Sequence, residues 1–114
     1  MVLVRRKRGR YRRALTAQEK ALLLAYCDRR MHGEAGINAR TGAMLGAFNV
    51  GQMSTARRMT YDYFSRYKIL FELARSFGAK DPEVRKLISR AFHLKRITAA
   101  EFRELRAQKS PATV

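Results

Sequence analysis

The sequence has few of the residues that crosslink a chain, span a membrane or bind metal. Its single cysteine, Cys27, excludes an internal disulfide and a thiolate metal cluster. The longest apolar run, residues 21–27, has seven residues and is too short to cross a bilayer. No long apolar segment follows the charges at the N-terminus, so a secretory signal is not indicated. We expect a protein that is not secreted and has no membrane partner.

Acidic residues are also scarce, because nine Asp and Glu stand against 25 Lys and Arg, for a formal net charge of +16. Arginine outnumbers lysine 18 to 7, and its planar guanidinium pairs with phosphate through two parallel hydrogen bonds. So strong a bias exceeds what solubility alone requires. The charge therefore favours a polyanionic partner, nucleic acid first, over an anionic membrane or a merely solvated surface.

Residues 1–15 are predicted to form a basic arm, since the first thirteen carry seven positive charges and no negative one. Such a segment buries too little apolar surface to fold alone. Beside nucleic acid its cations release condensed counterions, and its tyrosine is placed to stack on a base or sugar. We predict that it binds nucleic acid, with a solvated tail or a nuclear-import signal as the alternative. The residues predicted to bind are Arg5, Arg6, Lys7, Arg8, Arg10, Tyr11, Arg12 and Arg13.

Helical patterns fill residues 16–108, which we expect to form one domain followed by a tail at 109–114. The first helix begins at a capping box, in which Thr16 accepts from the backbone of Glu19 and Glu19 returns the bond. It should end near His32, where Gly33 follows. Its apolar stripe is predicted at Leu23, Leu24, Cys27 and Met31, with Leu22 and Tyr26 on another side.

Glycine and apolar spacing define the next two predicted helices. Residues 33–51 hold five of the seven glycines and predict only a short helix over about 42–50. Ser54 is placed to cap a long helix over about 55–77, which Gly78 ends. Its wide apolar stripe is typical of the central helix of a bundle, or of self-association through helix 55–77. The stripe consists of Met59, Tyr63, Phe64, Tyr67, Leu70, Phe71, Ala74 and Phe77.

Two further helix starts specify a C-terminal hairpin. Asp81 is expected to cap a helix whose first residue is Pro82, and Thr98 with Glu101 forms a second capping box. No segment alternates with a period of two, so no sheet is expected. The fold class predicted is all-α, a single compact bundle of four to five helices with an extended basic N-terminal arm.

Helix 55–77 also predicts a second binding face. At 100° per residue, Arg57, Tyr61, Lys68 and Arg75 share its outer side with Glu72. We predict that these three cations and the tyrosine bind nucleic acid, with a solvated outer face as the alternative. The C-terminal hairpin adds a mixed but mainly basic surface. It contains Lys86, Arg90, Lys95, Arg96, Arg103 and Arg106, with Glu101 and Glu104 among them.

Patterns for catalysis and metal binding are weak. His32 and His93 lie far apart, and neither has metal-ligand spacing with Cys27. The group Asp28, His32 and Glu34 could hold a metal, but neighbouring arginines favour surface pairing. No phosphate-binding loop ending in Gly-Lys-Ser/Thr occurs. We therefore expect no enzyme, metal, cofactor or small-molecule substrate.

A helix-turn-helix is the specific alternative for DNA binding. Ala47 and Gly51 have the Ala-xxx-Gly spacing of that motif. The positions that should then be apolar fall on Gln52, Arg57 and Thr60, which disfavours a recognition helix.

These observations predict a non-enzymatic, nucleic-acid-binding structural protein. It would neutralise phosphates of DNA or RNA, largely without sequence specificity, within a packaged nucleoprotein such as a virion, nucleoid or ribosome-like particle. Its location would be a reducing compartment or the interior of that particle. A helical, sequence-specific DNA-binding regulator is the first alternative, and a protein–protein adaptor that docks on an acidic partner is the second.

Overall fold

The computed structural model describes residues 14–34 and 36–109 of the chain. The described residues form six α-helices and no strand, which confirms the all-α class. The expected number of four to five helices is therefore too low. The helices are α2 (Ala17–Met31), α3 (Gly36–Ala47), α4 (Met53–Tyr63), α5 (Tyr67–Phe77), α6 (Pro82–His93) and α7 (Ala99–Arg106).

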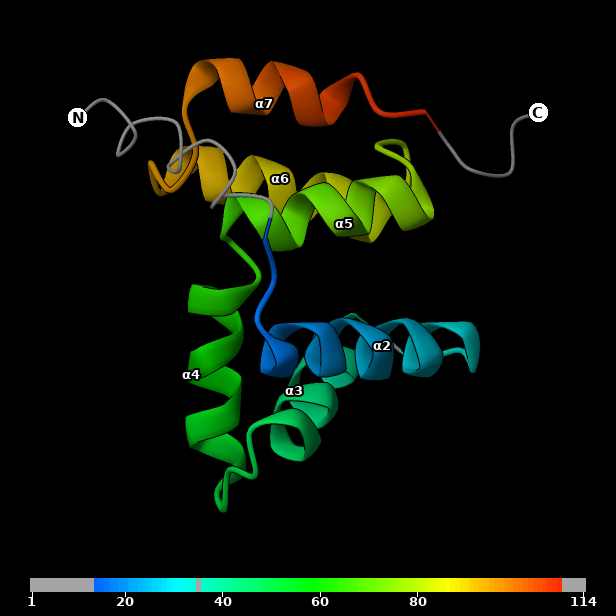
Figure 1. Cartoon of the computed structure of the whole chain (residues 1–114), viewed down its shortest axis with the longest axis vertical. Coiled ribbons are helices and arrows are strands. Elements are labelled where there is room, and N and C mark those ends of the chain that lie inside the picture. The colour runs from blue at the N-terminus through cyan, green and yellow to red at the C-terminus, as the bar shows by residue number, and fades with distance from the viewer. Residues whose placement is uncertain (1–13, 35, 110–114) are drawn as a thin grey trace.

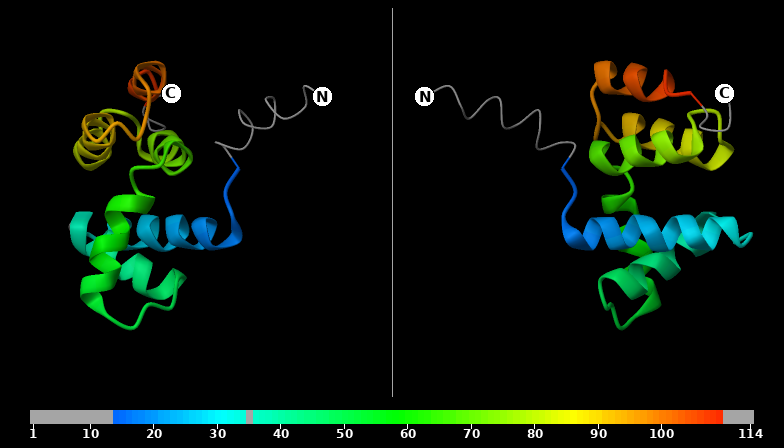
Figure 2. Two further views of the ribbon diagram at one scale, coloured as in Figure 1. Left: turned by 90° about the vertical axis from the view of Figure 1, so that its left-hand side faces the viewer. Right: turned by 45° about the vertical axis from the view of Figure 1, so that its right-hand side comes forward.

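The helices form two connected groups. The helices α5, α6 and α7 pack on one another, and Figure 2 shows them nearly end-on as a triangle. In the other group α3 packs between α2 and α4, and α4 stands across the direction of α5 to α7 (Figure 1). Contacts between α2 and α5 join the groups. The α5–α6 turn and the α6–α7 turn lie at opposite sides of the molecule (Figure 1).

Helix starts that are encoded by capping residues lie where the sequence places them. The Thr16 hydroxyl accepts from the Glu19 amide at 3.1 Å, and the Thr16 amide donates to Glu19 Oε1 at 3.0 Å. The second box has the same two bonds between Thr98 and Glu101, at 3.2 and 2.8 Å. Asp81 caps α6 by accepting from the backbone of Val84 at 3.1 Å. These three predictions are confirmed.

The prediction of one helix over residues 55–77 is wrong, because the helix is interrupted between α4 and α5. Arg66 has extended backbone angles (φ −81°, ψ 139°). The Ser65 hydroxyl donates to the carbonyl of Tyr61 at 2.7 Å and so satisfies the end of α4. The break turns Phe64 into the core, where its ring centroid lies 5.1 Å from that of Tyr26. Core packing therefore outweighs continuous helical hydrogen bonding here.

Two other helix boundaries differ from the prediction. The helix expected over 42–50 begins earlier and ends at Ala47, before Asn49, whose positive φ of 52° is left-handed. The helix expected from 55 begins at Met53, with Gln52 as its N-cap and no side-chain cap bond. Ser54 therefore does not cap α4.

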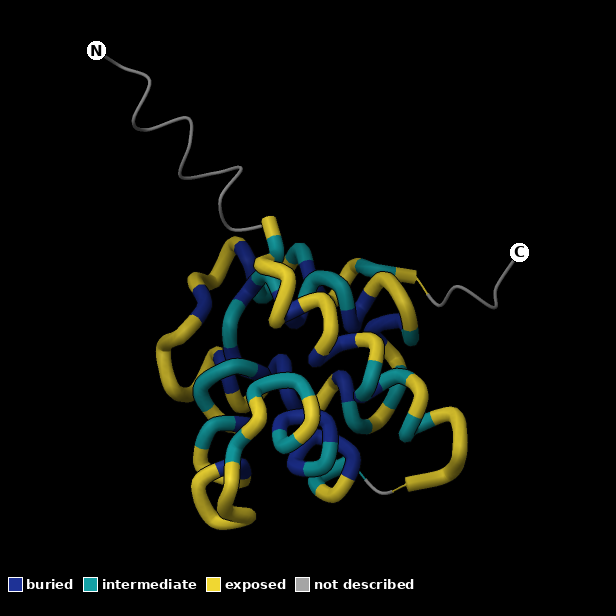
Figure 3. The backbone as a smooth tube through the Cα atoms, turned by 60° about the horizontal axis from the view of Figure 1, so that its bottom comes forward, coloured by how far each residue is buried: buried dark blue, intermediate teal, exposed yellow. Residues whose placement is uncertain are grey.

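The core is centred on Tyr26, which is fully buried and accepts from Arg30 Nη1 at 3.1 Å through its hydroxyl. On α2 the buried apolar residues are Leu22, Leu23 and Tyr26. Leu24 is 72% exposed and Met31 80% exposed, so the predicted stripe of α2 is partly wrong. Figure 3 shows buried and exposed segments alternating along the tube, as expected for amphipathic helices.

Candidate nucleic-acid interface

Most carboxylates of the protein are bound by its own cations. Six of the nine acidic residues pair with Arg or Lys within residues 14–34 and 36–109. Arg30 donates to both Asp81 oxygens, at 3.1 and 3.2 Å, and fastens α2 to the start of α6. Arg40 of α3 pairs with Glu83 of α6, and both side chains are largely buried. The six are Glu19, Glu34, Asp62, Glu72, Asp81 and Glu83.

Glu19 is the most enclosed of these carboxylates, with a side chain only 3% exposed. Burial opposes its ionisation, but the Thr16 amide and the cations Lys68 and Arg66 outweigh burial and lower its pKa. Lys68 Nζ lies 2.9 Å and Arg66 Nη1 3.2 Å from its oxygens. This cluster fixes α2 to the start of α5.

The pairing leaves a large excess of positive charge at the surface. Of the 18 basic residues after the arm, eleven form no ion pair with another residue that the structure describes, and all eleven are exposed. Glu19, Asp81 and Glu83 are paired inside the fold and Glu34, Asp62 and Glu72 nearer the surface, so the protein's own cations bind most of its carboxylates while these eleven cations stay exposed. The eleven are Lys20, Arg57, Arg58, Lys80, Arg85, Lys86, Arg90, Lys95, Arg103, Arg106 and Lys109.

Two contacts place α4 beside the end of α6. The guanidinium of Arg90 lies over the ring of Tyr61, 4.1 Å from its centroid. Arg96 donates to Asp62 at 3.0 Å, and Arg96 and Arg66 lower the pKa of that carboxyl despite the opposing effect of its partial burial. Figure 1 shows α4 and the α6–α7 turn on the same side of the molecule. We call this surface the basic edge; it consists of Arg57, Arg58, Tyr61, Arg90 and Lys95.

The basic edge unites part of the predicted second binding face with part of the C-terminal hairpin. Arg57 and Tyr61 lie one turn apart on α4, as predicted. Lys68 lies instead on α5, against Glu19, and Arg75 pairs with Glu72 at 2.7 Å. Because of the break, these four residues do not share one helix face. Their binding to nucleic acid stays a prediction, and the ion pairs make Lys68 and Arg75 the weaker candidates.

Sequence reasoning did not connect Arg90 with Tyr61. The two residues lie 29 positions apart, and only the fold brings Tyr61, near the end of α4, to Arg90, near the end of α6. The arm residues predicted to bind, Arg5 to Arg13 with Tyr11, lie outside the described residues. Self-association through residues 55–77 stays a prediction, but the single long helix on which it rested is absent.

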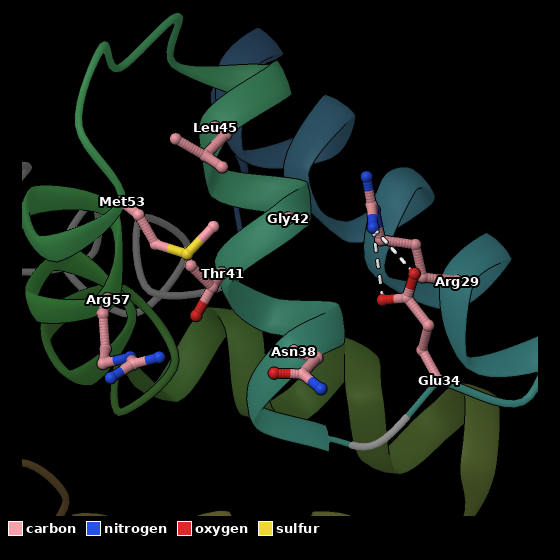
Figure 4. A pocket seen from close by; sticks show the side chains of 8 residues that line it. All are labelled: Arg29, Glu34, Asn38, Thr41, Gly42, Leu45, Met53 and Arg57. Atoms are coloured by element: carbon pink, nitrogen blue, oxygen red, sulfur yellow. Dashed lines mark hydrogen bonds and ion pairs between the residues drawn. The ribbon is translucent and has the colours of Figure 1, made fainter.

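A cavity of about 460 Å³ opens beside the basic edge (Figure 4). Met53 and Arg57 of α4 line one side, and Arg29 and Glu34 line the other, with Asn38, Thr41, Gly42 and Leu45 of α3 between them. Arg29 donates to Glu34 at 2.9 Å and lies so close to Gly42 that a Cβ there would overlap its guanidinium. The Thr41 hydroxyl donates to the carbonyl of Ile37 at 2.8 Å. Arg57 thus belongs both to the cavity and to the basic edge.

The described residues contain no group of three or more His, Cys, Asp and Glu arranged to hold a metal ion. Asp28 lies near His32, whereas Glu34 pairs with Arg29, so the three candidate metal ligands are divided. Within the described helices, none combines the length and apolar character that a membrane crossing requires.

Comparisons of the chain with models of known protein families, with curated proteins and with solved structures found no match.

Proposed function

We propose that this protein is a non-enzymatic structural component of a packaged nucleoprotein and neutralises the phosphates of DNA or RNA. The observation that carries the proposal is the set of eleven exposed cations without an ion pair among the described residues. A protein that merely needs solubility intersperses both signs on its surface. Here the carboxylates stabilise the fold, and the cations are left for an external polyanion.

The distribution of the cations supports contact with the nucleic-acid backbone. They lie on α2, α4, α6 and α7 and in the turns, on more than one side of the domain. Phosphate contacts of this kind give affinity and orientation but carry no sequence information. The basic arm adds seven further positive charges. A domain that meets phosphates on several sides suits a component embedded in nucleic acid.

A sequence-specific DNA-binding regulator is the first competing function. The exposed side of α4 carries Arg57, Arg58 and Tyr61, and an α-helix fits the major groove of DNA. A specific regulator would prefer one sequence over random competitor by roughly a thousandfold or more. An adaptor for an acidic protein would bind neither DNA nor RNA at physiological salt.

One titration separates these three functions. The full chain is titrated against labelled random duplex DNA, single strands and RNA at several salt concentrations. The proposed function predicts sequence-independent binding, with an affinity that falls steeply as salt rises because condensed counterions are released. A dominant preference for one sequence would favour the regulator. Absence of binding to all three polymers at physiological salt would leave the adaptor.

A further inference from the structure

A partly exposed aromatic stack lies between α6 and α7. The rings of Phe92 and Phe102 are stacked with centroids 4.4 Å apart and an interplanar angle of 26°. Arg106 lies over Phe102, with its guanidinium carbon 5.5 Å from the ring centroid. Phe92 is nevertheless 39% exposed, although it already has an aromatic partner. Contact with Phe102 holds the ring in place while part of it faces solvent.

Cations surround this stack. Arg85 and Phe92 lie seven positions apart on α6 and therefore share a face. Phe102 and Arg106 lie one turn apart on α7, with Arg103 beside them. The three arginines are exposed and form no ion pair within the part of the chain that the structure describes. We call the set Arg85, Phe92, Phe102, Arg103 and Arg106 the aromatic strip.

The acids of α7 do not face the strip. Glu101 is buried and accepts from the Thr98 amide in the capping box. Glu104 lies two positions after Phe102, so its side chain leaves the helix about 200° around the axis from the ring. The exposed surface around Phe92 thus combines an apolar aromatic face with positive charge.

We propose that the aromatic strip binds single-stranded nucleic acid, with an unpaired base stacked on Phe92 and the backbone phosphates on Arg85, Arg103 and Arg106. This inference rests on the proposed function and adds that the nucleic acid bound at this surface is single-stranded. A base inside a duplex has both faces covered by its neighbours, whereas an unpaired base can stack on an aromatic side chain. An apolar protein partner would use the ring but would have no need of three arginines around it.

The chain contains no tryptophan, which allows a direct test. Phe92→Trp places one indole in the strip, and Leu24→Trp places one on an exposed position of α2 as the matched control. Tryptophan fluorescence is then followed during titration with oligothymidylate and with a duplex of equal length. We expect strong quenching of the Phe92→Trp protein by the single strand, weak quenching by the duplex, and little change in the control.

A second variant measures the contribution to affinity and does not depend on the indole. Phe92→Leu keeps an apolar side chain but removes the stacking face, and should weaken single-strand binding by about tenfold while leaving duplex binding nearly unchanged. Circular dichroism verifies that both variants keep the helical fold.

The outcomes separate the two proposals. Binding of nucleic acid without selective quenching at Phe92, or equal quenching in the control, would overturn the aromatic strip and leave the proposed function standing. Failure of the unmodified chain to bind any of the polymers would overturn the proposed function itself.

Discussion

The guanidinium of Arg90 stacks on the ring of Tyr61, 4.1 Å from its centroid, and so joins α6 to α4. The ring of Tyr61 orients the Arg90 guanidinium, which would otherwise sample many rotamers. An oriented guanidinium can pair with phosphate at a smaller loss of conformational entropy. The contact thereby makes one basic edge from two helices distant in sequence.

Substitution of Arg90 should separate its charge from its stacked geometry. Arg90→Gln removes one phosphate contact, so the slope of log affinity against log salt for duplex DNA should become shallower by about 0.9. Arg90→Lys keeps the charge and should keep that slope, with weaker binding at every salt concentration. Equal slopes in the unmodified protein and in Arg90→Gln would show that this cation contacts no phosphate.

The pair of Arg40 and Glu83 should be important for stability. Glu83→Gln leaves the Arg40 charge in a site where its side chain is only 9% exposed, and should lower the free energy of unfolding by about 3 kcal/mol. Glu34→Gln is the control, because it breaks the half-exposed pair with Arg29 and should cost less than about 1 kcal/mol. Urea unfolding at pH 7 measures both variants. Similar losses would contradict the buried position of Arg40.

Glu19 should contribute to acid sensitivity. Its pKa is lowered in the folded protein, so its contribution to stability is complete above the ordinary value near 4.5 and is lost as pH falls through the folded value. Glu19→Gln keeps a residue suited to the capping box but removes the charge. It should lower the free energy of unfolding by about 2 kcal/mol at pH 7.

Urea unfolding between pH 7 and pH 3 tests this prediction for Glu19. The difference between Glu19→Gln and the unmodified protein should shrink below about pH 4.5, since a protonated Glu19 resembles glutamine. Glu72→Gln, which breaks the exposed pair with Arg75, should change stability by less than about 1 kcal/mol. A difference that is independent of pH would contradict the stabilising role of the Glu19 charge.

Deletion of residues 1–13 should remove a large part of the salt dependence without unfolding the domain. If each of the seven cations of this segment contacts one phosphate, they contribute about 6 to the slope of log affinity against log salt for duplex DNA. All six described helices lie between Ala17 and Arg106, outside the deleted segment. An unchanged slope in the shortened chain would show that the arm does not anchor the protein on nucleic acid.

Local signals in the sequence predicted the features that depend on neighbouring residues. The Thr16 and Thr98 capping boxes and the Asp81 cap each complete their bonds within three positions, and all three are present. The break at Phe64 to Arg66 had no such signal, because no glycine or proline marks it. The apolar spacing through this segment fits one helix as well as two.

Features that depend on tertiary packing could not be predicted from spacing alone. Leu24 and Met31 match the apolar period of α2, yet the core is reached by the side that carries Leu22 and Tyr26. The basic edge likewise requires α6 to lie beside α4. Composition revealed the excess of cations, but the long-range pairs that bind Glu19, Asp81 and Glu83 became visible only in three dimensions.

The central claim is that the basic edge binds phosphates, and the salt dependence of duplex binding tests it most directly. The double variant Arg57→Gln/Arg58→Gln removes two charges from the edge. Lys80→Gln/Lys109→Gln removes two exposed charges near the Ala79–Gln108 backbone contact, at the other end of the domain (Figure 1). We predict a slope shallower by about 1.8 for each variant, because the proposed phosphate contacts lie on more than one side of the domain. A slope for Arg57→Gln/Arg58→Gln equal to that of the unmodified protein would contradict the claim.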